Sequence, residues 1–245
     1  MPLPQAALPH DSWAAHYDRV YALTFGALYQ HMTDSTLAEI ARVAPPPGRL
    51  VDFGAGTGRL ALPLAAQGYE VTAVEPCAGM LQCLAAKPGS ERVSPVRCLL
   101  QDFQAAAPFD LALCVFTVIA YLTDEDALRA GFRAMAAALK PGGRLLLDIP
   151  RRVAFNGMHV EREGMVREVA VRPLDGDLYR YEERTRLEGP EGVRVYEDAF
   201  VIRYWEPETV RRVAGECGLT VAEDVSATFA GTGAGYWWLE KGAAA

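Results

Sequence analysis

Acidic side chains stand at three turns that could surround a nucleoside. Asp52 opens the segment Asp-Phe-Gly-Ala-Gly-Thr-Gly at residues 52–58, where a buried strand runs into a glycine turn and then a helix. Glycines let a ligand approach the backbone closely, and the first turn of a helix offers free N–H groups. Glu75 ends the next expected strand, where a carboxylate can accept hydrogen bonds from both ribose hydroxyls. Asp102 follows a third expected strand and could accept a hydrogen bond from an adenine amine, with Phe103 flanking the ring.

The spacing and charge of these turns favour one cofactor over another. The glycines follow Gly-x-Gly-x-Gly, and Arg59 occupies the third glycine position of the dinucleotide fingerprint Gly-x-Gly-x-x-Gly. Asp52, Glu75 and Asp102 would repel the pyrophosphate of a nicotinamide dinucleotide. S-adenosylmethionine carries no phosphate, and its sulfonium and ammonium outweigh its single carboxylate. The acidic turns therefore favour S-adenosylmethionine over a nicotinamide cofactor.

Alternating elements between residues 49 and 150 would position these turns. Short apolar runs alternate with helical patterns there, which is typical of βαβ units and a parallel sheet. Thr123 and Asp126 form a capping box that predicts the start of a helix ending before residues 140–143. Two helices within residues 13–43 are expected to cover the sheet. The other expected helices are residues 60–66 and 76–86, and the expected strands are residues 50–53, 69–75, 96–100, 109–116 and 144–149.

The pattern changes after Pro150. Three strands rich in Val, Tyr and Arg are expected, with an Asp-Gly turn between the first two, at residues 165–172, 178–187 and 193–205. A helix from Pro207 to Gly218 and two strands, residues 219–229 and 236–240, then return to the core. A three-stranded antiparallel unit is too thin to stand alone, so it should pack on the main domain.

The sequence thus predicts an α/β fold with a Rossmann-like, seven-stranded, mostly parallel sheet and helices on both faces. A small antiparallel three-stranded insertion follows strand five. The expected division is a cofactor-binding domain at residues 1–150, a β lid or insertion at residues 151–205, and a return to the core sheet at residues 206–245.

Composition narrows the classes of function. A formal net charge of −7 disfavours general binding to nucleic acid. No segment has the length of a membrane span, and the amino terminus lacks a signal pattern, so a cytoplasmic protein is expected. The five cysteines are scattered and without zinc spacing, which predicts reduced thiols and no metal site. The four histidines show no ligand spacing and are expected on the surface.

Several motifs, in order and at their usual spacing, resemble the class I S-adenosylmethionine-dependent methyltransferases. They are the glycine segment, the acid at position 75, Gln-Asp-Phe at 101–103, Phe-Asp-Leu-Ala-Leu-Cys-Val-Phe at 109–116 and Leu-Lys-Pro-Gly-Gly-Arg-Leu-Leu-Leu-Asp-Ile-Pro at 139–150. The resemblance implies that the glycine segment holds the methionine part, the second-strand acid the ribose and the third-strand acid the adenine. The implied cofactor-binding residues are Asp52, Gly54, Ala55, Gly56, Gly58, Glu75, Pro76, Met80, Gln101, Asp102, Phe103 and Phe116.

Within that class the chain is most similar to small-molecule N-methyltransferases of the sugar-amine type. Tyr-Asp-Arg-Val-Tyr at residues 17–21 matches their Tyr-Asp-x-x-Tyr start, and residues 116–122 are similar to the stretch after their fourth strand, with Tyr121 where some relatives have histidine. The resemblance implies in-line methyl transfer to a small-molecule acceptor such as an amine, which requires alignment and exclusion of water. Tyr17, Tyr21 and Tyr121 are the candidates for positioning the acceptor or accepting its proton. A helical pair such as Tyr17 and Tyr21 could equally pack in a core.

Other functions remain open at this stage. An RNA or protein methyltransferase could use the same domain, and a binding module could keep the fold without catalysis. Alternation places Tyr179, Tyr181 and Glu183 on one face of the insertion, together with Tyr196, Phe200 and Ile202 of its last strand. That face is expected to roof the methyl-transfer cleft, and a homodimer interface is the alternative use of the same aromatic residues.

Overall fold

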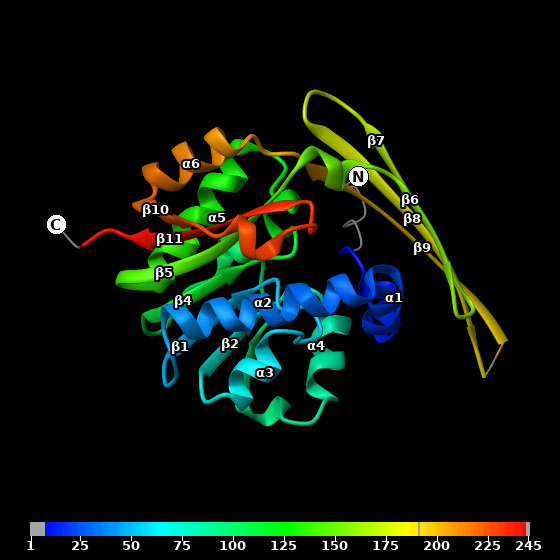
Figure 1. Ribbon diagram of the computed structural model, residues 1–245, viewed down its shortest axis with the longest axis horizontal. Coiled ribbons are helices and arrows are strands. Elements are labelled where there is room, and N and C mark those ends of the chain that lie inside the picture. Colours follow the sequence, from blue (N-terminus) through cyan, green and yellow to red (C-terminus); the bar gives the residue numbers. More distant parts are fainter. Residues whose placement is uncertain (1–7, 191, 244–245) are drawn as a thin grey trace, which may run out of the picture.

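The computed structural model describes residues 8–190 and 192–243, which form two β-sheets and the helices around them (Figure 1). The large sheet has seven strands in the order β10-β11-β5-β4-β1-β2-β3. Strands β1 to β5 pair in parallel, whereas β11 runs antiparallel to both β5 and β10. The strands are β1 (Arg49–Phe53), β2 (Glu70–Val74), β3 (Val93–Val96), β4 (Phe109–Cys114), β5 (Leu139–Pro150), β10 (Leu219–Asp224) and β11 (Ala234–Lys241). This arrangement confirms the expected α/β fold.

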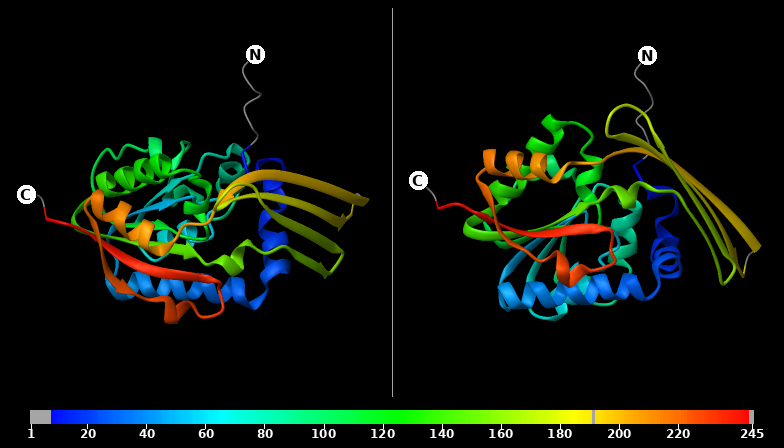
Figure 2. Two further views of the ribbon diagram at one scale, coloured as in Figure 1. Left: turned by 90° about the horizontal axis from the view of Figure 1, so that it is seen from above. Right: turned by 45° about the horizontal axis from the view of Figure 1, so that its top comes forward.

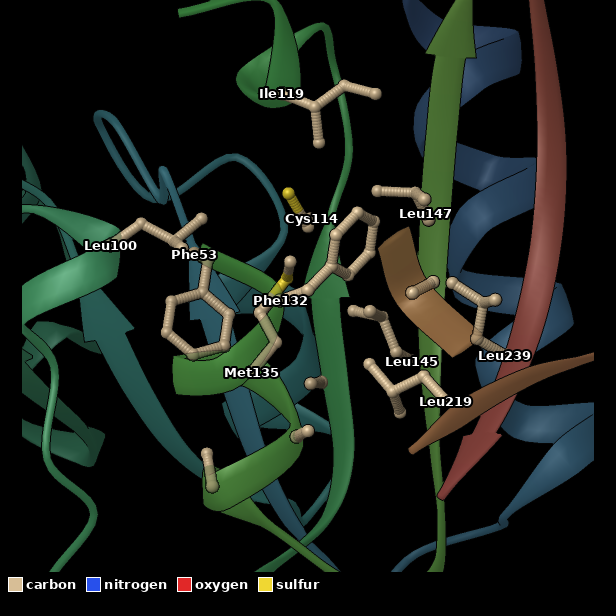
Figure 3. Packing of buried hydrophobic residues seen from close by; sticks show 14 of the residues in the cluster. Phe53, Leu100, Cys114, Ile119, Phe132, Met135, Leu145, Leu147, Leu219 and Leu239 are labelled. Atoms are coloured by element: carbon tan, nitrogen blue, oxygen red, sulfur yellow. The ribbon is translucent and has the colours of Figure 1, made fainter. Parts of the chain in front are cut away.

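Helices cover both faces of the large sheet (Figure 1). On one face lie α5 (Glu125–Ala138) and α6 (Pro207–Glu216), and on the other lie α2 (Ala27–Val43), α3 (Ala61–Ala66) and α4 (Ala78–Ala85). Figure 3 shows the first of these two cores, in which Phe132 and Met135 of α5 pack beside Cys114 of β4 and Leu145 of β5. Parallel strands that are buried on both faces consist of nearly continuous apolar residues, which is why their positions could be predicted from the sequence.

Several boundaries differ from those expected from the sequence. Helix α5 is capped by Asp124, whose carboxylate accepts a hydrogen bond from the Ala127 N–H at 2.7 Å, so the expected capping box at Thr123 is wrong by one residue. Strand β3 covers Val93–Val96, so the expected strand at residues 96–100 is wrong except at Val96, and the short helix η3 (Leu100–Asp102) follows β3. Strand β10 ends at Asp224 before the short helix η6 (Ser226–Phe229).

The insertion forms a four-stranded antiparallel sheet, so the expected count of three strands is wrong. Its order is β6-β7-β8-β9, with β6 (Met158–Arg162), β7 (Met165–Pro173), β8 (Leu178–Gly189) and β9 (Gly192–Arg203). The first strand has five residues, of which only Met158 and Val160 are apolar, so its alternation is too short to mark it clearly. A two-residue turn at Glu163 and Gly164, both with positive φ, joins it to β7, which is the geometry of a tight hairpin.

The inner face of this second sheet packs on the amino-terminal helices η1 (Asp11–His16) and α1 (Tyr17–Phe25), as both views in Figure 2 show. Arg167 of β7 and Glu183 of β8 form a buried ion pair at 2.9 Å, and the Arg167 guanidinium lies 4.6 Å from the centre of the Tyr21 ring. Buried charges are tolerated when they are paired and hydrogen-bonded, and Thr24 Oγ1 accepts a further hydrogen bond from Arg167. The sheet is therefore attached to the main domain by packing and by buried polar contacts.

In the part of the chain that the structure describes, no helix is both long enough and apolar enough to cross a membrane.

The cap of α5 can be tested by replacing two neighbouring residues. We expect Asp124→Ala to lower the free energy of unfolding by about 1 kcal/mol, because the Ala127 N–H then loses its partner. Thr123→Ala is the matched control and should change the stability less, because the Thr123 side chain makes no cap. Thermal or urea unfolding of both variants measures this, and a larger loss for Thr123→Ala would contradict the assignment.

Candidate cofactor and acceptor site

The loop after β1 needs glycine at three positions for two different reasons. Gly54, Gly56 and Gly58 have φ values of +74°, +55° and +86°, a region that L side chains rarely adopt. A Cβ on Gly54 would lie 2.5 Å from Val118 Cγ2, and one on Gly58 would lie 3.0 Å from Leu84 Cγ. A Cβ on Gly56 would meet nothing within 4 Å. Gly54 and Gly58 thus permit close packing, whereas Gly56 leaves open space for a ligand.

Glu75 joins this loop to the turn after β2. Its Oε2 accepts a hydrogen bond from the Gly56 N–H and its Oε1 accepts one from the Cys77 N–H, both at 2.9 Å. Burial raises the pKa of Glu75, and the two backbone hydrogen bonds oppose that rise. Each carboxylate oxygen keeps a further lone pair, so the group can also accept hydrogen bonds from a ribose diol.

A cavity of about 600 Å³ opens beside the carboxyl ends of β1, β2 and β4. Nine of the expected cofactor-binding residues line it, namely Asp52, Gly54, Ala55, Gly56, Glu75, Pro76, Met80, Gln101 and Phe116. Ligands of open α/β sheets bind at this edge of the sheet. The structure thus brings most of the expected residues together around one space.

Three expected cofactor residues lie elsewhere. Gly58 packs under the loop against Leu84. Asp102 is exposed and does not line the cavity, whereas Gln101 of the same short helix does. Phe103 is buried in the core with its ring edge-on to Phe53, at 5.4 Å between centroids. The turn of η3 therefore directs Gln101, and not the acid beside it, toward the cavity.

Two further charged groups were not predicted as binding residues from the sequence, namely Arg59, which lines the cavity, and Asp148, which does not. The guanidinium of Arg59 lies 4.9 Å from the centre of the Phe116 ring and donates a hydrogen bond to Thr33 Oγ1. Asp148, at the carboxyl end of β5, accepts the Thr117 N–H. In the sequence, the features that could have indicated them are an arginine directly after the glycine segment and an acid within an apolar strand.

The buried carboxyl groups are unusually easy to protonate. Burial raises the pKa of Asp52 to about 7, with a further rise from the Glu75 charge and an opposing effect of Arg59. Burial likewise raises the pKa of Asp148 to about 7, against hydrogen bonds from Thr117 and Phe116. A bound cation would stabilise the ionised form of these groups. Asp52 and Arg59 both line the cavity, and opposite charges at one site suit a ligand that carries both an ammonium and a carboxylate.

Aromatic side chains form the opposite wall of the cavity. Tyr17, Tyr121 and Phe200 line it, whereas Tyr21 lies behind Tyr17 with the two rings stacked at 4.1 Å. Burial raises the pKa of Tyr17 and of Tyr121 well above the usual range, so both phenols stay protonated. Phe200 belongs to β9, which means that the aromatic face of the second sheet contacts the same chain's cavity. Of the three expected tyrosines, the structure therefore places Tyr17 and Tyr121 at the site.

His10 is buried, so the expectation of a surface histidine is wrong at this position. Its Nε2 lies 3.1 Å from Tyr121 Oη, and its ring lies 5.1 Å from that of Trp13 and 5.3 Å from that of Phe200. Burial, with a smaller contribution from Arg167, lowers the pKa of His10 to about 3. A lone histidine near the amino terminus carries no spacing signal, which is why the sequence did not reveal it.

The comparisons with known proteins agree with this geometry. Residues 50–143 match the family model of a methyltransferase domain. The chain is 32% identical over 154 residues to a malonyl-[acyl-carrier protein] O-methyltransferase of Methylococcus capsulatus, which covers 58% of this chain and 53% of that protein. It is 29% identical over 145 residues to a tRNA 5-carboxymethoxyuridine methyltransferase of Escherichia coli, covering 56% and 54%. The chain thus spans about half the length of the curated relatives it matches.

A solved structure extends the likeness to nearly the whole chain. The SAM-bound amino pentose methyltransferase CalS10 of Micromonospora echinaspora superposes with a TM-score of 0.75 at 25% identity, covering 92% of this chain and 96% of that one. The match therefore includes the second sheet as well as the large one. Residues 50–143 thus match a methyltransferase domain, and the fold of nearly the whole chain is similar to that of an S-adenosylmethionine-bound methyltransferase.

Proposed function

We propose that this protein transfers a methyl group from S-adenosylmethionine to an amine of a small molecule. The observation that carries the proposal is the charge pattern of the cavity, where Glu75, Asp52 and Arg59 stand around the glycine loop beside an aromatic wall. These groups complement the ribose diol, the ammonium and the carboxylate of one ligand. The name of the amino pentose methyltransferase CalS10 supports an amine acceptor.

The residues divide into a cofactor side and an acceptor side. Glu75 would hold the ribose hydroxyls, while Asp52 and Arg59 would hold the amino-acid part, and Met80 and Gln101 would border the adenine. The cofactor supplies an electrophilic methyl on a sulfonium, and aromatic faces such as Tyr17 attract such a cation. The protein then aligns the acceptor nitrogen with the methyl and keeps water away.

The second sheet would roof the acceptor side. Phe200 of β9 lines the cavity, and its ring stacks on Tyr181 of β8 at 4.6 Å. The same sheet is attached to α1 and η1, which carry Tyr17 and Trp13. A roof built in this way limits the size of the acceptor, which favours a small molecule over a macromolecule. A homodimer interface on the same aromatic residues is the alternative, and the position of Phe200 at the cavity of its own chain favours the roof.

Methylation of tRNA is the second candidate, because one similar protein is a tRNA 5-carboxymethoxyuridine methyltransferase. The net charge of −7 and the covered cavity disfavour it. A non-catalytic binding module is a weaker alternative, since the cofactor loop is complete.

A screen with radiolabelled methyl groups tests the proposal directly. Purified protein is incubated with labelled S-adenosylmethionine and panels of metabolite amines, alcohols and carboxylates, with bulk tRNA as a separate arm. We expect label to enter an amine and not tRNA. Labelling of tRNA alone would support the second candidate, and cofactor binding by calorimetry without any transfer would favour a binding module.

The role of Glu75 can be measured by cofactor affinity. Because a carboxylate accepts charge-assisted hydrogen bonds from the ribose, Glu75→Ala should weaken binding of S-adenosylmethionine by roughly 2 kcal/mol or more. Glu75→Gln keeps an acceptor for the Gly56 N–H and should lose less. Asp102→Ala is the matched control for loss of one negative charge, since that side chain is exposed outside the cavity. Calorimetry decides, and equal affinities for the wild type and Glu75→Ala would contradict the assignment.

Asp52 should couple cofactor binding to the release of a proton. Its pKa of about 7 means that about half of the groups are protonated at pH 7, and a bound ammonium would ionise them. Affinity for S-adenosylmethionine should therefore rise from pH 6 to pH 8, with up to about half a proton released per site at pH 7. Calorimetry in buffers of different ionisation enthalpy measures that release. Asp52→Asn should reduce it, and an unchanged release in that variant would place the titrating group elsewhere.

A further inference from the structure

Three polar side chains from distant parts of the chain meet at the aromatic wall of the cavity. His10 precedes η1, Tyr121 ends the short helix η4 (Val118–Tyr121), and Asp198 lies on the inner face of β9. The Nδ1 of His10 is 3.7 Å from Asp198 Oδ2, which is beyond hydrogen-bond distance, and Nδ1 has no hydrogen-bond partner among the described residues. The same Asp198 oxygen accepts the backbone N–H of His10 at 2.6 Å. The Nε2 of His10 is 3.1 Å from Tyr121 Oη. The side chains of His10 and Asp198 are each only 10% exposed.

The surroundings of His10 define where its ring carries a proton. Burial and the nearby Arg167 of β7 lower its pKa to about 3, so the ring is neutral at ordinary pH and has a single N–H. The charged and titratable groups around it are Asp198, Arg167, Tyr121 and, from α1, Tyr17, whose ring lies 5.5 Å away. A carboxylate attracts an N–H and repels a nitrogen lone pair. The Asp198 carboxylate, which faces Nδ1 across 3.7 Å, therefore favours the tautomer with the proton on Nδ1 and with Nε2 as an acceptor.

This tautomer determines the direction of the next hydrogen bond. In this tautomer Nε2 can only accept, so the hydroxyl of Tyr121 donates to it. A tyrosine hydroxyl has one hydrogen, so the lone pairs of Tyr121 Oη are left for a ligand in the cavity that this residue lines. A free hydroxyl could rotate and either donate or accept, whereas this one is held as an acceptor.

We propose that Asp198 and His10 fix the Tyr121 hydroxyl as a hydrogen-bond acceptor that selects a methyl acceptor bearing an N–H, meaning a primary or secondary amine. The inference rests on the proposed function. Tyr121 contacts the amine, whereas His10 and Asp198 are positioning residues that act through it. The N–H bonded to Tyr121 orients the amine so that its lone pair faces the sulfonium methyl.

The chemical step balances without a proton acceptor on the protein. The nitrogen lone pair forms the new N–C bond as the S–C bond breaks, and the electron pair of that bond stays on sulfur as a neutral thioether. The product is a methylammonium, which loses its proton to solvent after release. A tertiary amine has no N–H in its neutral form and should be a poor acceptor.

The tautomer of His10 can be observed without any substrate. The full-length protein is labelled with ¹⁵N-histidine, and its imidazole nitrogens are recorded by NMR, with His10→Gln identifying the His10 signals. We expect a protonated Nδ1 and a bare Nε2 that do not change between about pH 5.5 and 8. A ring protonated on Nε2, or one that titrates near its ordinary pKa, would overturn the inference.

A double-mutant cycle tests whether His10 acts through Tyr121. With the primary amine found in the methyl screen, we expect His10→Gln, Asp198→Asn and Tyr121→Phe each to lower kcat/KM by about tenfold while cofactor affinity stays unchanged. In the Tyr121→Phe background, His10→Gln and Asp198→Asn should add less than about twofold. His159→Gln, at an exposed histidine of β6, is the matched control.

The outcomes separate the two proposals. Additive losses in the cycle, or equal rates for a primary amine and its tertiary analogue, would overturn the inference while leaving the methyltransferase function intact. Absence of cofactor binding or of any methyl transfer by the wild type would overturn the proposed function itself. In that case the NMR experiment still decides the tautomer of His10, and an Nε2-protonated ring would reject the inference independently.

Discussion

The buried carboxylate of Glu75 is the group on which the cofactor side of the cavity depends. Its two oxygens accept N–H groups from Gly56 after β1 and from Cys77 after β2. A buried charge is tolerated only with such partners, and here the partners belong to the two turns that a nucleoside would contact. The same interaction thus fixes the shape of the loop and presents a negative group to the ligand.

The acceptor side depends on a different kind of constraint, which is the packing of the second sheet on the amino-terminal helices. The buried ion pair of Arg167 and Glu183 and the apolar contacts around Trp13 and Tyr21 attach that sheet to the main domain. Breaking one partner of a buried pair leaves an uncompensated charge, so this attachment has little freedom to shift. The position of Phe200 at the cavity follows from it.

The amino-acid sequence by itself determined the large sheet and most of the cofactor loop. Apolar runs, glycine spacing and strand-end acids are local features, and they predict without knowledge of distant contacts that Asp52, Gly56 and Glu75 lie together, as they do around the cavity. The same local features misplaced the cap of α5, since Asp124 and its neighbour are both plausible caps until the backbone is known. They also missed β6, a five-residue strand with only two apolar side chains, which is held in place by pairing with β7.

Only the tertiary structure decided which side chains share the cavity. Gln101 lines it and the neighbouring acid Asp102 does not, because both residues lie in the short helix η3 and not at the end of an extended strand. His10 and Asp198 are 188 residues apart, and neither belongs to a recognisable motif. Their contact arises because β9 returns across the amino-terminal segment. A pattern within one stretch of sequence reports on that stretch alone, whereas the surroundings of a buried side chain are set by the elements folded around it.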